Sequence, residues 1–117
     1  MGFGGYDLWE TVWNGSEWSE PENLGATVNT AANESHPYLS ADGNELWFNS
    51  DSRMGYTGPA LYRTLRTDSG WTAPVEMVSN FAGDPGLDAQ GNIYFTHHFF
   101  DSGLNMIEAD VYVARKR

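Results

Sequence analysis

The chain has 117 residues, a net charge of -10 and no cysteine. Its 6 Lys and Arg residues against 16 Asp and Glu residues argue against a nucleic-acid or anionic-membrane partner, because such binding requires clustered positive charge. The absence of cysteine excludes disulfide bonds, thiolate catalysis and cysteine-ligated zinc.

The chain carries neither a targeting pattern nor a membrane-helix pattern. Its first residues, MGFGGYDLW, contain no basic segment followed by an apolar run, and no stretch approaches the ~18 apolar residues that a membrane helix needs. We therefore expect no signal peptide in this chain, and its localisation is left open.

The N-terminal part predicts two strands after a short flexible lead. Residues 7–13 form the first, and the second runs from Trp18 to Gly25 after a turn at Asn14-Gly15. We interpret them as the third and fourth strands of a four-stranded unit that lacks its first two. A polar connection over residues 26–34 follows.

The rest of the chain predicts one complete unit and one incomplete unit. The complete unit has strands at 38–40, 45–50, 60–66 and 74–78. The incomplete unit has strands at 86–88, 92–98 and 110–114, with a loop over 99–108 and no fourth strand. We expect no helix longer than two turns, because apolar residues at helical spacing extend no further than that.

Two repeated segments support these units. SHPYLSADGNELWFNSD at Ser35 to Asp51 returns as GDPGLDAQGNIYFTHH at Gly83 to His98, and Gly43 and Gly91 are predicted to occupy positive-φ turn positions. Trp18-Ser19-Glu20-Pro21 likewise returns as Trp71-Thr72-Ala73-Pro74. A repeat of roughly 50 residues made of four short strands is typical of one blade of a β-propeller.

The predicted fold class is therefore all-β, with propeller blades of four antiparallel strands and about two blades per chain. A single domain over 1–117 would hold a half blade (6–25), a full blade (35–78) and an incomplete blade (83–117). All five prolines fit, because they fall on edge strands or in loops. The runs Leu46-Trp47-Phe48 and Ile93-Tyr94-Phe95 are apolar on both faces, as expected of strands between neighbouring blades.

The repeat resembles the TolB-type, WD40-like propeller repeat. The matching residues are Ser40, Asp42, Gly43, Leu46, Phe48 and Ser50, with Leu61-Tyr62 and Asp110-Val111-Tyr112 as the later strand. Ala41 replaces the usual proline, and Gln90 replaces the usual aspartate of the second copy. The resemblance implies a propeller whose relatives are periplasmic or secreted and include binding modules, peptidase accessory domains and lyases.

Candidate ligand-binding residues cluster on one predicted face, at blade connections and at the ends of second strands. They are His36, Asp84, Asp51, His97, His98 and Asp101. Imidazole and carboxylate groups together suit a divalent cation, which is the one cofactor considered. Alternatively, His97 and His98 point to opposite sides of their strand, one packed and one solvated.

Three tryptophans have two possible roles. Trp13, Trp18 and Trp71 either fill gaps between blades or offer platforms for sugar rings.

The leading interpretation of the function is a non-enzymatic binding module for a protein or carbohydrate ligand, with no catalytic residue. The alternatives are a metal-dependent carbohydrate-active enzyme, similar to propeller lyases, and a structural fragment without a ligand.

The strand count also predicts assembly. About nine strands make little more than two blades, whereas closed propellers use four to eight. A lone copy is expected to leave Trp47, Phe48, Tyr94 and Phe95 open to water, so a ring-shaped homo-oligomer follows, with a trimer favoured over a dimer. A fragment of a longer propeller and a small β-sandwich are the competing explanations.

Overall fold

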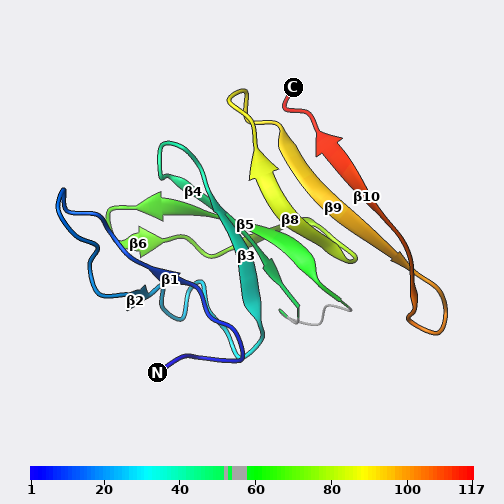
Figure 1. Ribbon diagram of the computed structural model, residues 1–117, viewed down its shortest axis with the longest axis horizontal. Coiled ribbons are helices and arrows are strands. Elements are labelled where there is room, and N and C mark those ends of the chain that lie inside the picture. The colour runs from blue at the N-terminus through cyan, green and yellow to red at the C-terminus, as the bar shows by residue number, and fades with distance from the viewer. Residues whose placement is uncertain (52, 54–57) are drawn as a thin grey trace.

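Strands make up all the regular structure in the described part of the chain. The computed structural model describes residues 1–51, 53 and 58–117, and within these ranges it contains ten strands and no helix. The strands form antiparallel sheets of 2, 5 and 3 strands, which follow one another in chain order across the longest axis (Figure 1). The prediction of an all-β fold is confirmed. Accordingly, no helix suited to crossing a membrane occurs in the described ranges.

The three sheets are named here by their position in the chain. The N-terminal pair contains β1 (Trp9–Glu10) and β2 (Glu22–Asn23). The central sheet contains β3 (Glu34–Leu39), β4 (Glu45–Ser50), β5 (Ala60–Thr67), β6 (Gly70–Trp71) and β7 (Val75–Val78). The C-terminal sheet contains β8 (Ala82–Leu87), β9 (Ile93–Phe100) and β10 (Met106–Ala114).

The sequence repeats recur as repeated strand registers. The β3–β4 pairing Tyr38↔Trp47 returns in β8–β9 as Gly86↔Tyr94, and the β4–β5 pairing Trp47↔Arg63 returns in β9–β10 as Tyr94↔Val113. Therefore β8, β9 and β10 are the counterparts of β3, β4 and β5.

The N-terminal pair repeats the outer half of the central sheet in the same way. Trp9↔Asn23 returns as Tyr62↔Glu76, and the isolated bridge Trp13↔Trp18 returns as Arg66↔Trp71. One constant shift along the chain relates both pairings. Strands β1 and β2 are thus the counterparts of β5 and β7, the third and fourth strands of the central unit.

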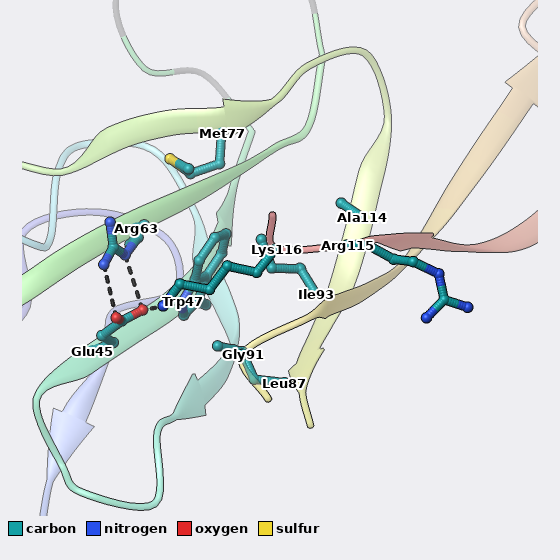
Figure 2. Close-up of a pocket in the computed structure, with 10 residues that line it drawn as sticks. All are labelled: Glu45, Trp47, Arg63, Met77, Leu87, Gly91, Ile93, Ala114, Arg115 and Lys116. Atoms are coloured by element: carbon teal, nitrogen blue, oxygen red, sulfur yellow. Dashed lines mark hydrogen bonds and ion pairs between the residues drawn. The ribbon is translucent and has the colours of Figure 1, made fainter. Parts of the chain in front are cut away.

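The central sheet is covered on both faces. Phe48 and Tyr62 pack with Leu8 and Val28 from the N-terminal segment to form the hydrophobic core. On the other face Trp47 is also buried, and its ring lies between the Arg63–Glu45 ion pair and the C-terminal sheet (Figure 2). The expectation that Trp47 and Phe48 are open to water in one copy is therefore wrong, because both neighbouring sheets cover them.

Several strand boundaries differ from the predicted ones. Strands β3 and β8 begin about four residues earlier than expected, because each continues through a bulge next to its proline. Half of the predicted loop 99–108 is strand, because Asp101 closes a tight turn over residues 101–105 by accepting backbone N–H bonds from Gly103 and Asn105. The predicted strand 7–13 is reduced to β1 and the Trp13 bridge.

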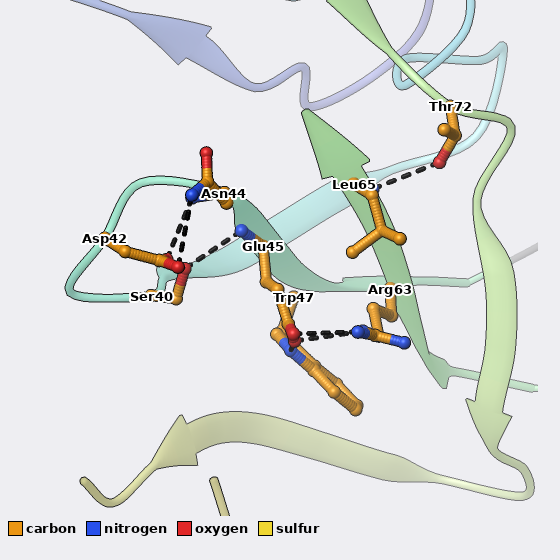
Figure 3. A network of polar contacts seen from close by, with 8 residues as sticks. All are labelled: Ser40, Asp42, Asn44, Glu45, Trp47, Arg63, Leu65 and Thr72. Carbon is orange, nitrogen blue, oxygen red and sulfur yellow. Dashed lines mark hydrogen bonds and ion pairs between the residues drawn. The ribbon is translucent and has the colours of Figure 1, made fainter. Parts of the chain in front are cut away.

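Aspartate side chains fasten the hairpin turns. Asp42 accepts hydrogen bonds from the Ser40 hydroxyl and from the Asn44 backbone and side chain (Figure 3). The hydroxyl of Ser40 is the largest of the causes that lower the pKa of Asp42 below its ordinary value near 3.8, and the Asn92 amide is the largest for the lowered pKa of Asp88. These carboxylates stabilise the fold above their ordinary pKa and lose that contribution as the pH falls through the lowered one.

Gly43 tests the turn assignment. Its φ is 74° and that of Gly91 is 80°, so the predicted positive-φ positions are confirmed. A side chain at Gly43 would meet open space, so backbone strain alone should make Gly43→Val lower the free energy of unfolding by roughly 1–3 kcal/mol. Gly86→Ala is the control, because Gly86 is equally uncrowded but lacks a positive φ. Urea unfolding compares the two, and equal small effects would contradict the assignment.

Candidate functional site

His36 and Asp84 occupy equivalent bulges on the first strands of two sheets. Each precedes a proline and has a left-handed backbone, with φ of 48° and 53°. The ladder of β3 is irregular between Ser35 and Tyr38, and β8 is irregular at the counterpart position. The two exposed side chains meet with His36 Nε2 and Asp84 Oδ1 3.7 Å apart. The repeat therefore brings two predicted site residues together.

A pocket of about 320 Å³ opens beside this pair, and we call it the inter-sheet pocket. It is lined by His36, Asn49, Pro59, Phe81, Ala82, Gly83, Asp84, His98 and Phe100. The rings of Phe81 and Phe100 lie 4.6 Å apart and give it an apolar wall. Phe81 also has a left-handed φ of 60°, a conformation that costs a bulky residue energy and often marks functional sites.

Polar side chains also line the inter-sheet pocket. The buried Oδ1 of Asn49 accepts no hydrogen bond from the described residues. His98 Nδ1 lies 3.1 Å from the Phe81 carbonyl oxygen, and because a carbonyl only accepts, Nδ1 carries the proton. In the neutral ring Nε2 of His98 is then an acceptor. The pocket thus combines acceptors and an imidazole with an apolar wall.

His97 lies away from this pocket. It lines a different pocket with Phe95, Phe99 and Tyr112, and its ring centroid is 4.6 Å from that of Phe99. Adjacent residues of a strand point to opposite faces, so His97 and His98 are separated. The expected convergence of all three histidines is therefore wrong, and the alternative of opposite sides is correct. Both rings are half-buried, however, rather than one packed and one solvated.

The remaining two predicted site residues have structural partners. Asp51 accepts hydrogen bonds from the Asn33 backbone N–H at 3.0 Å and from its side-chain amide at 2.6 Å. It lines a pocket next to His36 and Asn49. Asp101 is exposed and holds the β9–β10 turn, away from the inter-sheet pocket.

Within the described residues, no three His, Asp or Glu side chains are grouped so as to hold a metal ion. Comparison of the chain with protein-family models, curated proteins and solved structures finds no match. The TolB-type resemblance accordingly rests on the motif residues of the repeat.

Asn49, Phe81 and Phe100 are among the lining residues that sequence reasoning misses. Asn49 lies near the end of a buried strand and Phe81 lies between two predicted strands, and neither is one of the motif residues of the repeat. Phe100 falls in the predicted loop, because the pattern of the turn at Asp101 is weak. The Asp101-to-Asn105 spacing, which repeats the Asp88-to-Asn92 hydrogen-bonding pattern, is the signal that could have found it.

Backbone strain at the site gives a stability prediction. Asp84→Gly should leave the free energy of unfolding unchanged or raise it by up to about 1 kcal/mol, because glycine adopts a left-handed φ without strain. Asp88→Gly is the control and should lower stability, because the Asp88 carboxylate holds its turn. Thermal unfolding compares the variants, and a clear loss for Asp84→Gly would mean that its side chain stabilises the fold.

Proposed function

We propose that this chain is a non-enzymatic binding module of the TolB-like propeller type, which binds its ligand in the inter-sheet pocket. The repeated registers support the propeller architecture, since each sheet repeats part of one four-stranded unit. In such an architecture first strands line the central channel. The inter-sheet pocket lies beside two first strands, β3 and β8.

One observation carries the proposal: residues with strained backbones converge on an apolar pocket that contains an unpaired acceptor. His36, Phe81 and Asp84 all have left-handed φ angles and all line the pocket. Each such residue costs of order 1–3 kcal/mol, which the surrounding structure must hold in place. Concave sites with an apolar lining and a few convergent polar groups are typical ligand sites.

The lining indicates the chemistry of the ligand. Acceptors on Asn49, Asp84 and His98 suit a ligand that donates hydroxyl or amide hydrogens. The Phe81–Phe100 wall suits an apolar face on the same ligand. A saccharide ring or a short peptide segment presents both features.

Amide chemical shifts of the labelled chain test this function. Maltotriose, cellotriose and a random heptapeptide pool are titrated separately, and one of them should shift the amides of Phe81, Ala82 and Gly83. Asn49→Leu should abolish the shifts, whereas His97→Ala, in the other pocket, should retain them. Absence of shifts in all three titrations, or shifts confined to other surfaces, would overturn the proposal.

A divalent cation gives a separate prediction. No metal-holding group of three side chains occurs in the described ranges, so zinc, manganese and calcium should each leave the melting temperature of the chain unchanged. A thermal-shift series with each cation measures this. A rise that His36→Ala abolishes would instead favour the metal-dependent carbohydrate-active enzyme, for which the described contacts give no specific support.

A further inference from the structure

The C-terminal sheet exposes residues whose counterparts in the central sheet are covered. Trp47 is 2% exposed, whereas its counterpart Tyr94 is 40% exposed. Leu61 is fully buried, whereas its counterpart Val111 is 75% exposed. Val113 lies on the same face as Tyr94 and Val111, since it pairs with Tyr94 in the register. We call Tyr94, Val111 and Val113 the C-terminal open face.

The N-terminal pair shows the same contrast on its opposite side. Tyr62 is 6% exposed, whereas its counterpart Trp9 is 47% exposed. Trp71 packs against the core, whereas its counterpart Trp18 is exposed together with Trp13, 5.4 Å away between ring centroids. We call Trp9, Trp13 and Trp18 the N-terminal open face.

The packing inside the chain shows that these two faces are complementary. The Trp47 face of the central sheet lies against the C-terminal sheet, and Trp47, Ile93 and Lys116 line one pocket between the two sheets (Figure 2). The Tyr62 face contacts the N-terminal segment through the core. The face of each sheet that carries the Trp47 position therefore packs on the next sheet along the chain, and the face that carries the Tyr62 position packs on the preceding sheet. The C-terminal open face corresponds to the Trp47 face, and the N-terminal open face corresponds to the Tyr62 face.

A specific contact across two sheets extends this comparison to single residues. Arg66 Nη2 of the central sheet lies 2.5 Å from Glu10 Oε1 of the N-terminal pair. The strand registers place Val113 of the C-terminal sheet at the position that Glu10 occupies in the N-terminal pair. They likewise place Trp13 of the N-terminal pair at the position that Arg66 occupies in the central sheet. Stacking a second copy in the same way would place Val113 against Trp13, two apolar side chains.

Charge adds a further complement between the two ends. Three of the 6 Lys and Arg residues lie at positions 115–117, where Lys116 faces the central sheet across the pocket beside Trp47 and the Arg115 guanidinium points away from it (Figure 2). The N-terminal segment carries Glu17, Glu20 and Glu22, all exposed. Opposite charges at opposite ends favour head-to-tail over head-to-head association.

We propose that a second copy of this chain docks its N-terminal open face on the C-terminal open face of the first. The contact is heterologous, so repetition closes into a ring when the rotation allows it, and two copies would supply six sheets, within the four to eight blades of closed propellers. This inference rests on the blade architecture of the proposed function, but it uses surfaces separate from the inter-sheet pocket.

Sedimentation velocity and equilibrium test the contact. The wild-type chain should sediment at about twice its 13.0 kDa mass, and Val113→Glu and Trp13→Arg should each weaken association at least about 30-fold. Combining the two substitutions should restore association, because the new carboxylate of one copy would face the new guanidinium of the next, as Glu10 faces Arg66 within the chain. Leu104→Glu, at the exposed β9–β10 turn, is the control and should associate normally. Circular dichroism verifies that each variant is folded.

Two results would overturn the contact. The first is a folded wild-type monomer at micromolar concentration. If the tryptophan fluorescence of that monomer also responds to maltotriose, Trp13 and Trp18 form a platform for sugar rings instead of an interface between copies. The second is normal association of both single variants. A monomeric Val113→Glu variant should still give the ligand-induced shifts at Phe81, which separates failure of this contact from failure of the proposed function.

Discussion

Replacing Phe48 with alanine should lower the free energy of unfolding by about 3–5 kcal/mol, the cost of emptying a large buried aromatic site. The Phe48 side chain is fully buried, and its ring stacks on Tyr62 at 6.0 Å between centroids. It lies in the core that joins the N-terminal segment to the central sheet. Since small domains are stable by about 5–15 kcal/mol, the loss would be a large share of the total.

Phe95 is the matched control for Phe48. It stacks on Tyr112 at 5.8 Å, as Phe48 stacks on Tyr62, but it is only half-buried. Phe95→Ala should therefore cost about 1–2 kcal/mol in urea unfolding of the dissociated chain. Equal losses for the two variants would contradict the unequal covering of the two sheets.

Glu34→Gln is expected to lower the free energy of unfolding by about 2–3 kcal/mol. The buried carboxylate accepts hydrogen bonds on both oxygens, whereas the NH₂ group of a glutamine amide would face one of these donors and could not accept from it. Glu34 accepts hydrogen bonds from the Thr30 backbone N–H at 2.8 Å, the Thr30 hydroxyl at 2.7 Å and the Ser50 hydroxyl at 2.9 Å. Its charge also favours the charged form of half-buried Arg53, whose pKa is lowered by burial and partly raised again by Glu34.

Glu45→Gln is the control for Glu34→Gln. Glu45 accepts two hydrogen bonds from Arg63 (Figure 3), but both side chains of this pair are partly exposed to solvent. Such an ion pair contributes less than about 1 kcal/mol. Urea unfolding of both variants makes the comparison. A loss for Glu34→Gln no larger than that for Glu45→Gln would mean that the buried network adds little stability.

The repeat makes the order of the strands and their turns predictable. Gly43 and Gly91 mark the turns, because apolar runs on either side of a polar glycine pair favour a hairpin. His36 and Asp84 match each other in the sequence repeat, and the same bulge displays both. These features depend on local backbone preference, which a single sequence carries.

Features that depend on contacts between sheets are not predictable in the same way. Asn49 belongs to the central sheet and the wall of Phe81 and Phe100 lies at the C-terminal sheet, so their common pocket forms only where the two sheets meet. The apolar run Leu46-Trp47-Phe48 predicts a strand between two neighbours, but the sequence does not show how closely β8 of the same chain approaches the central sheet and covers Trp47. The exposure of Trp13 and Trp18 follows from the half-unit at the N-terminus rather than from their own pattern.

Equivalent positions of two repeats, His36 and Asp84, meet beside the inter-sheet pocket, and chemical cross-linking tests this arrangement most directly. The chain has no cysteine, so His36→Cys and Asp84→Cys can be combined and treated with a short bismaleimide reagent. We predict a nearly complete intramolecular cross-link, which a bound ligand should suppress. The control combines His36→Cys with Asp101→Cys, and this pair should give little cross-link. A yield at positions 36 and 84 no higher than that of the control would contradict this arrangement.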